Sequence, residues 1–578
     1  MNQSSCSAGT IDCLAPTPPP GYQQCADYDG GFHSPAASMP LIVSGSMIAI
    51  VMSICIGGND AANAWGATVG SGAIPLRRAL LIGGFGEWLG ATLLGAGVSN
   101  TIQKGVSHPE DPACWACGYC DSRMSVYAVG MLAALIGACV FLLLATFGKM
   151  PVSTTHAIVG GVVGMTMVGT ASGSPLPRPT MCLDLGMAGL GGIVASWVIS
   201  PLLAGAIAGV VVVLTDRLCV RSAAPVKRAL LALPCLYALT TFLMVALTLI
   251  KSKPTKEALP FGAKLGVAAL LALLAFAVVR LSVVPRVRRS VEEAFPAAFG
   301  SRAGMRVVAR PVLATPALHP QSVEMSVSAV RGVVEPVIVV EDDERLSASC
   351  ADGGGGAAGG GAGAAAAGGV HTKRGGGGSG GSAAEAGGAL PAASTRPSGP
   401  RRPIGEEASV YVFRYLLVFV AFLESFAHGA NDTANATSAF AAVWNAYSAG
   451  LYACANVETQ WWIMSAAGLF VAIGVNLMGY RVIQTIGEDL TPLDYQIGFA
   501  IELAATITVV IATLLGFPVS TTHCKVGAVV FAGFAVSGRK GVDLSLFGKI
   551  VLTWVATLPF AGALAAGLTA VFTAAVRS

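Results

Sequence analysis

Apolar runs long enough to cross a bilayer, separated by short polar stretches, recur along most of the chain. A transmembrane helix needs about 20 predominantly apolar residues, and length separates such runs from buried strands. Twelve helical segments are predicted, at about 41–58, 79–98, 125–147, 152–171, 185–214, 229–250, 262–284, 410–430, 462–479, 497–516, 519–537 and 549–574. The pattern therefore predicts an all-α polytopic membrane protein, in which the shorter segments could form re-entrant hairpins.

Two stretches interrupt this pattern. Residues 1–40 contain no Lys or Arg, which predicts an extracellular N-terminal tail. Residues 286–408 contain the acidic run Glu341–Glu344 and a Gly/Ala-rich tract at 353–388, and such a composition buries too little apolar surface to fold. We expect a long disordered cytosolic loop there. The membrane part then divides into a first repeat (41–216), connecting spans (217–285) and a second repeat (409–578).

The basic residues predict the orientation. Arg77 and Arg78 are the first basic residues of the chain, and the Arg286–Arg289 cluster and the Arg539-Lys540 pair fall on the same side of the predicted membrane. Positive charge favours the cytosol, so both termini are expected outside, with the plasma membrane as the expected location. The two halves enter the membrane from opposite sides, which makes them inverted repeats.

Composition excludes several classes of protein. The chain is 54% hydrophobic and 11% charged, whereas soluble domains carry about a quarter charged residues. The net charge of +4 is not gathered into a basic cluster interleaved with aromatic residues. We therefore expect the lipid bilayer, and not nucleic acid, as the surrounding partner.

Two polar motifs occur twice within the membrane part. The hexamer Pro-Val-Ser-Thr-Thr-His occupies 151–156 and 518–523, and an Asn-Asp-x-x-Asn element precedes each copy, at 59–63 and 431–435. The spacing from Asp to Ser is 93 residues in the first half (60 to 153) and 88 in the second (432 to 520). Such a duplicated polar site in a membrane domain is typical of transporters.

The Asn-Asp elements are candidate cation sites. Polar side chains in a bilayer are costly unless they face a cavity or a partner, and carboxylate and amide oxygens suit small hard cations. Gly57-Gly58 and Gly429 are expected to permit a helix break that frees further carbonyl ligands. Helix capping is the alternative role, and two inverted copies disfavour it. The predicted cation ligands are Asn59, Asp60, Asn63, Asn431, Asp432 and Asn435, with sodium, as the resemblance described below implies, at Asp60, Asn63, Asp432 and Asn435.

The hexamers are candidate anion sites. Pro is suited to a helix start, and the residues after it offer hydroxyls and free backbone N–H groups at the positive end of a helix dipole. Two such ends could hold a tetrahedral oxyanion between them. His156 and His523 are expected to pack against or orient this turn. The predicted anion ligands are Ser153, Thr154, Thr155, Ser520, Thr521 and Thr522.

Charge connects the two kinds of site. Further acidic residues, Glu87, Glu424 and Glu502, are predicted to be buried, and Lys525 is the basic residue just after the second hexamer. Carboxylates repel an anion, so cations bound between them would favour anion binding, and the reverse follows by linkage.

Six cysteines fall on the predicted outer side: Cys6, Cys13, Cys25, Cys114, Cys117 and Cys120. Disulfides, free thiols and a zinc site are the alternatives there. A second Cys-x-x-Cys at finger spacing is missing from the sequence, which disfavours zinc.

The motifs resemble the signatures of the inorganic phosphate transporter family, the sodium–phosphate symporters. The resemblance rests on Gly-Gly-Asn-Asp-Ala-Ala-Asn-Ala (57–64), His-Gly-Ala-Asn-Asp-Thr-Ala-Asn-Ala (428–436) and Pro-Val-Ser-Thr-Thr-His-Cys-Lys-Val-Gly (518–527). Arg481–Gly487 and Gly498–Thr506 fit as well. The similarity covers roughly 41–216 and 409–575.

This resemblance implies symport of phosphate with sodium or, in some members, protons, and transport-essential acids at Glu87 and Glu502. When the repeats are aligned, Glu87 corresponds to about Val471 and Glu502 to Leu135, so the site is only pseudo-symmetric. The chain departs from the usual family pattern at Gly57-Gly58, where Gly-Ala is common, and at Thr154, where the first repeat of many members has Gly or Ala.

The sequence thus predicts a secondary active transporter that imports phosphate by alternating access, with sodium as co-substrate and no cofactor. A proton-coupled symporter is the main alternative. An intramembrane hydrolase needs one activated nucleophile, and two equivalent motifs argue against it. A channel or receptor could also use the buried carboxylates. Whether the chain forms a homodimer is left open.

Overall fold

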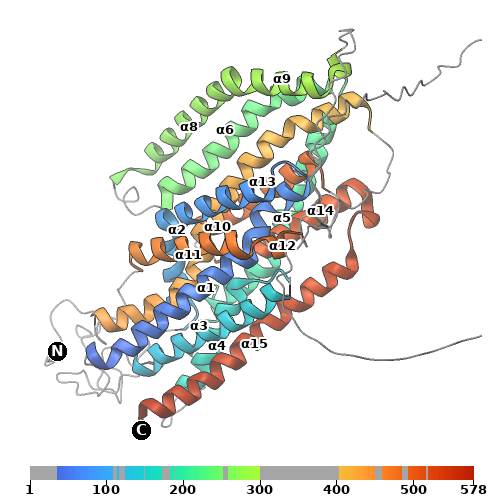
Figure 1. Cartoon of the computed structure of the whole chain (residues 1–578). Coiled ribbons are helices and arrows are strands. Elements are labelled where there is room, and N and C mark those ends of the chain that lie inside the picture. Colours follow the sequence, from blue (N-terminus) through green and yellow to red (C-terminus); the bar gives the residue numbers. More distant parts are fainter. Residues whose placement is uncertain are drawn as a thin grey trace, which may run out of the picture. The chain divides into compact units, whose positions relative to one another are not determined.

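The computed structural model describes residues 35–107, 114–115, 124–148, 150–171, 182–187, 189–251, 258–299, 402–449, 459–484, 493–515 and 518–577. Helices make up nearly all of this part, which belongs to one compact unit (Figure 1). The first half contains α1 (Pro35–Gly70), α2 (Leu76–Gly105), α3 (Met124–Phe147), α4 (Thr154–Ala171), α5 (Leu190–Thr215), η3 (Asp216–Val220), α6 (Pro225–Lys251), α8 (Phe261–Val278), η4 (Val279–Val283), α9 (Val284–Ala294) and η5 (Pro296–Phe299). The second half contains α10 (Ile404–Ala449), α11 (Trp461–Met478), α12 (Tyr480–Gln484), α13 (Tyr495–Leu515), α14 (Thr521–Ser537), η7 (Gly538–Gly541) and α15 (Leu544–Arg577).

The predicted helical membrane segments are confirmed. Ten helices of the described residues are long and apolar enough to cross a membrane. The remaining two predicted segments are α4 and α14, of 18 and 17 residues. Gly130 of α3 lies against Met165 of α4, and Gly161 of α4 lies against Ala134, so α3 and α4 form an antiparallel hairpin. Helices α13 and α14 pack as the corresponding pair.

Helix contacts show that the halves are inverted. Gly83 of α2 lies against Trp65 near the end of α1, so α2 returns antiparallel to α1 after the turn at Gly72, where φ is 77°. Along α2, Gly90 meets Phe426 of α10 and Ser99 accepts a hydrogen bond from Thr437, 3.4 Å away. Helices α2 and α10 therefore run parallel, and the two Asn-Asp helices α1 and α10 run antiparallel.

The expected helix breaks are not present. Helices α1 and α10 continue through Asn59-Asp60 and Asn431-Asp432 without interruption. A Cβ on Gly57 would lie 2.0 Å from the Val471 carbonyl oxygen, and one on Gly429 would lie 2.1 Å from that of Glu87. These glycines allow close helix packing rather than a break, as small residues commonly do in membranes.

The predicted loop at 286–408 is partly wrong at its borders. Helix α9 extends to Ala294 and α10 begins at Ile404. Val284, Val287 and Val291 recur at helical spacing and are buried, which explains why α9 stays packed on the helices beneath it. The central part, 300–401, lies outside the described residues.

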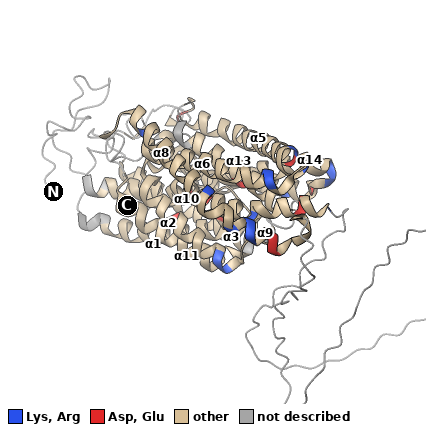
Figure 2. Ribbon diagram, turned by 90° about the horizontal axis from the view of Figure 1, so that it is seen from above, with Lys and Arg blue, Asp and Glu red and all other residues tan. Residues whose placement is uncertain are grey.

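Basic residues gather at one end of the helices. The turn after α1, η3, α9 and the start of α10 share one core cluster, and Arg414 donates a hydrogen bond to the Ala73 carbonyl, 2.9 Å away. Figure 2 shows most Lys and Arg residues toward this end. The start of α1 and the end of α15 lie at the opposite end (Figure 1).

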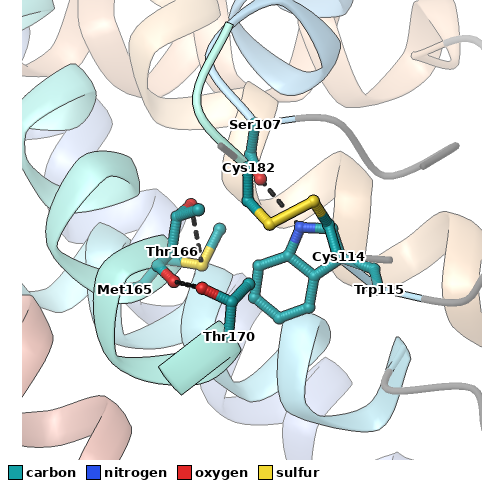
Figure 3. Close-up of a disulfide and its surroundings, with 7 residues drawn as sticks. All are labelled: Ser107, Cys114, Trp115, Met165, Thr166, Thr170 and Cys182. Atoms are coloured by element: carbon teal, nitrogen blue, oxygen red, sulfur yellow. Dashed lines mark hydrogen bonds between the residues drawn. A yellow bond between two sulfur atoms is a disulfide. The ribbon is translucent and has the colours of Figure 1, made fainter. Parts of the chain in front are cut away.

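One disulfide joins the segment after α2 to the segment before α5. Cys114 is bonded to Cys182, with 5.5 Å between their Cα atoms (Figure 3). The adjacent Trp115 is buried and donates a hydrogen bond to Ser107 Oγ, 2.8 Å away. Cys182 was absent from the predicted set, and its bond excludes Cys114 as a zinc ligand. The other predicted cysteines, Cys6, Cys13, Cys25, Cys117 and Cys120, lie outside the described residues.

Candidate functional site

Each hexamer forms the start of a short helix. Residues 151–153 and 518–520 have no regular secondary structure, Ser520 has an extended backbone, and α4 and α14 begin at Thr154 and Thr521. Ser153 Oγ accepts a hydrogen bond from the His156 backbone N–H (3.2 Å), and Ser520 Oγ accepts one from that of His523 (3.3 Å). The serines therefore act as N-caps, while their own hydroxyl hydrogens stay available to a ligand.

The two helix starts meet each other. Thr155 Oγ1 donates a hydrogen bond to the Val519 carbonyl (3.4 Å), and Thr522 Oγ1 donates one to the Val152 carbonyl (3.1 Å). The contacts are reciprocal, so hexamers from distant parts of the chain form one site with pseudo-two-fold symmetry.

The first Asn of each Asn-Asp element holds the hexamer of its own repeat. Asn59 Oδ1 accepts a hydrogen bond from the Val152 N–H (3.1 Å), and its amide donates one to the Met150 carbonyl (3.0 Å). Asn431 Nδ2 donates a hydrogen bond to the Val519 carbonyl (2.9 Å). The backbone before each of these short helices is thereby fixed to α1 or α10.

The last Asn reaches the hexamer of the opposite repeat. Asn63 Nδ2 donates a hydrogen bond to Thr522 Oγ1 (3.0 Å), and Asn435 Nδ2 donates one to Thr154 Oγ1 (2.8 Å). The two long helices and the two hairpins are thus joined in a crossed arrangement, and all the predicted cation and anion ligands are buried within it.

The two aspartates converge on one histidine. His428 Nε2 lies 2.7 Å from Asp432 Oδ2 and 3.8 Å from Asp60 Oδ2, and its Nδ1 lies 2.7 Å from Glu87 Oε2. Thr521 donates a hydrogen bond to Asp432. His428 was not among the predicted site residues. A histidine inside a membrane span, four residues before an aspartate, was the signal that could have identified it.

Several buried oxygen atoms of this cluster have no hydrogen-bond partner in the described structure: Asp60 Oδ2, Asn63 Oδ1, Asn431 Oδ1 and Asn435 Oδ1. Buried polar atoms are nearly always paired, so a group of unpaired oxygens calls for an explanation. Asp60, His428 and Asp432 also offer donor atoms that lie within 4.8 Å of one another. Carboxylate and amide oxygens form a donor set that fits a hard cation such as sodium.

Glu502 lies in a second charged cluster. Lys525 of α14 forms ion pairs with Glu502 of α13 and with Glu424 of α10, the latter at 3.2 Å, and all three side chains are buried. The corresponding positions of the first repeat are Met52, Leu135 and Ile158, which are buried in an apolar core. This ionic triad therefore exists in the second repeat alone.

Glu87 is asymmetric in the same way. Glu87 pairs with His428, whereas the equivalent residue of the second repeat is the apolar Val471. The backbone carbonyl of Val471 lies against Gly57 in the same way that the backbone carbonyl of Glu87 lies against Gly429. This packing confirms the alignment of Glu87 with Val471 that the sequence predicted. Each repeat thus has an apolar residue where the other repeat has the glutamate.

The hexamer histidines pack between tryptophans. The His156 and His523 rings meet at right angles with centroids 4.4 Å apart, and each ring lies 3.8 Å from an indole, that of Trp197 or of Trp554. His523 Nδ1 also lies 3.2 Å from the Trp197 carbonyl oxygen. This is the packing role that was expected for both histidines.

Comparisons with known proteins agree with this geometry. The model of the phosphate transporter family matches residues 56–565. A zebrafish (Danio rerio) sodium-dependent phosphate transporter 1-A is 28% identical, over 92% of this chain and 94% of its own length. A putative phosphate permease of Pyrococcus furiosus is also 28% identical, over 91% and 95%. A solved structure titled "The sodium-dependent phosphate transporter" aligns with a TM-score of 0.65 at 26% identity, over 93% of this chain and 99% of its own.

Proposed function

The chain belongs to the phosphate transporter family, and from this premise we propose that it imports phosphate by symport with sodium. Membership makes it a multi-pass membrane transporter and not an enzyme. The observation that carries sodium coupling is the set of unpaired buried oxygens beside Asp60 and Asp432. Two relatives, from zebrafish and mouse, are named as sodium-dependent phosphate transporters.

Sodium binds, in this proposal, at the Asn-Asp elements. Asp60 and Asn63, like Asp432 and Asn435, lie within one turn of helix, where the amide nitrogen donates to the carboxylate (3.0 and 3.4 Å). In the proposal each pair supplies sodium with its carboxylate and its amide oxygen. Three-residue spacing places both side chains on the same face of α1 or α10. No helix break is needed for this coordination.

Phosphate binds between the starts of α4 and α14. Each start offers a cap serine, two threonine hydroxyls and backbone N–H groups without an intrahelical partner. The hydroxyls of Thr521 and Thr522 donate to Asp432 and to backbone carbonyl oxygen in the structure. We propose that cation binding draws the Asp432 carboxylate away from the Thr521 hydroxyl, which then turns toward the anion.

The charges make the two events interdependent. The carboxylates of Asp60 and Asp432 repel a bound anion unless cations neutralise them. Bound sodium therefore raises the affinity for phosphate, and bound phosphate raises the affinity for sodium by the same factor. The crossed contacts between repeats support alternating access in which one repeat moves against the other.

Proton coupling is the second candidate. The buried His428, held between Glu87 and both aspartates, is a group that could take up a proton in place of a sodium ion. This observation favours protons as an additional or alternative coupled ion.

We place the transporter in the plasma membrane with both termini outside. The support for this orientation is the collection of basic residues at the end of the helices opposite the start of α1 and the end of α15 (Figures 1 and 2). The transport unit comprises the repeats at 41–216 and 409–578, joined through the spans at 217–285.

The test is uptake of radiolabelled phosphate into proteoliposomes that contain the purified full chain. We expect uptake with an inward sodium gradient and at least tenfold less when choline replaces sodium. If phosphate uptake in choline equals uptake in sodium and external acid stimulates it, protons and not sodium are the coupled ion.

A further inference from the structure

A cavity without any hexamer residue in its lining lies where α6, η4, α9, η5 and the start of α10 meet. Its volume is about 580 Å³, and its lining includes Lys227, Arg280 and Arg288. None of its described lining residues is acidic. It is bordered by the first turn of α6, which begins at Pro225.

The basic side chains around this cavity are only partly neutralised. Arg288 forms an ion pair with Glu292, 2.8 Å away. Within the described residues, Lys227 and Arg280 have no acidic partner. Three cationic groups from three helical elements, α6, η4 and α9, therefore line one cavity, and the described residues give an ion pair to one of them alone.

The same cavity has an apolar side. Leu230, Val284 and Phe299 line it, together with Leu231, which is 65% exposed. Leu281 next to Arg280 is 76% exposed. Exposed leucines on membrane-length helices are expected to face lipid tails, so the apolar side of the cavity is suited to contact with an acyl chain.

Helix α9 fits the boundary between lipid tails and headgroups. Its valines point inward, while Arg286, Arg288 and Arg289 are exposed. An amphipathic helix with Arg on its polar face is typical of membrane surfaces. Figure 2 shows basic residues along α9.

We propose that this cavity binds the phosphate-bearing headgroup of an anionic membrane lipid. Lys227, Arg280 and Arg288 contact the headgroup phosphate, and an acyl chain lies along Leu231 and Leu281. Clusters of basic residues at a membrane exit attract anionic lipids, and guanidinium groups match phosphate oxygens in geometry. The site is separate from the transport site, because none of its lining residues belongs to the Asn-Asp elements or the hexamers.

The test compares lipid binding by two triple variants of the full chain in phosphatidylcholine nanodiscs. Lys227→Gln, Arg280→Gln and Arg288→Gln remove the cavity charges. Arg78→Gln, Arg539→Gln and Lys540→Gln are the matched control, because they remove three exposed charges outside the cavity. Native mass spectrometry measures bound phosphatidic acid as its fraction in the bilayer increases, and thermal unfolding shows that both variants are folded.

We expect the cavity variant to need at least fivefold more phosphatidic acid for half-saturation, and the control to behave as the wild type. Lys227→Glu alone should shift binding in the same direction. An equal loss of phosphatidic acid binding in both triple variants would show that the lipid responds to general surface charge, and it would overturn the proposal. Displacement of the lipid by soluble glycerol phosphate at the same concentration would overturn it as well, because the site would then recognise free phosphate. Both measurements are independent of transport.

Discussion

At the residue scale, the central feature is the meeting of Asp60 and Asp432 from two antiparallel helices at one histidine. The sequence predicted both aspartates because buried acids stand out in apolar segments. It did not predict their shared contact with His428, since proximity across helices depends on packing that one sequence does not encode in any local pattern.

Replacing Asp60 or Asp432 by Asn tests the cation role. Asn keeps the shape but removes one negative charge, so we expect the sodium concentration for half-maximal uptake to rise at least fivefold. Apparent phosphate affinity should recover in part at saturating sodium. Asp216→Asn is the control, because Asp216 pairs with Arg221 outside the site. Unchanged sodium dependence in both variants would refute cation binding there.

Hydroxyl removal tests the anion role. Thr154→Ala and Ser520→Ala each remove one donor, and a hydrogen bond to a charged group contributes about 1.5–3 kcal/mol, or roughly 10- to 100-fold in affinity. We expect the phosphate KM to rise accordingly, with a smaller change in sodium dependence. Thr569→Ala is the control, because this buried hydroxyl bonds only its own helix at Ala565. A wild-type phosphate KM in both site variants would rule out phosphate binding between the starts of α4 and α14.

At the element scale, apolar run length predicted the helical segments well, because about 20 apolar residues in sequence admit few other structures. The glycine prediction was wrong at Gly57 and Gly429. Glycine permits either a break or a close approach, and only the facing backbone, here of α11 and α2, decides between them. Cys182 was missed for the same reason, since its partner is fixed by tertiary contact.

The ionic triad of Glu424, Glu502 and Lys525 can be tested by substitution, and the apolar residues at the same positions of the first repeat provide the control. Lys525→Met alone leaves Glu424 and Glu502 buried without a counter-charge, which is expected to destabilise by about 3–5 kcal/mol. The triple variant Glu424→Met, Glu502→Leu, Lys525→Ile copies the first repeat and should unfold near the wild-type temperature. Uptake should be lost in both variants if the triad serves transport.

Thermal unfolding in detergent and uptake in proteoliposomes separate these effects. A triple variant that is stable and transports normally would show that the triad has no transport role. A triple variant less stable than Lys525→Met would contradict the view that the charges, rather than the packing, make the single variant unstable.

At the scale of the whole molecule, charge bias predicted the inverted repeats before any contact was known. Antiparallel α1 and α10 place equivalent motifs face to face, so each half completes the site of the other. Glu87 and Glu502 break this symmetry, because each has an apolar residue at the equivalent position of the other repeat. The sequence predicted the Asn-Asp elements and the hexamers as candidate sites but not His428, and only the assembled helices bring all of them together in one buried cluster.

The most direct test of the account is coupled flux in one set of proteoliposomes. Vesicles with wild-type chain receive an inward phosphate gradient and equal sodium on both sides, with ²²Na and ³²P counted together at clamped membrane potential. Obligatory symport predicts that phosphate entry raises the sodium concentration inside the vesicles above the concentration outside, and that Asp60→Asn/Asp432→Asn abolishes this accumulation. Phosphate entry without any net sodium movement in the wild type would contradict the account.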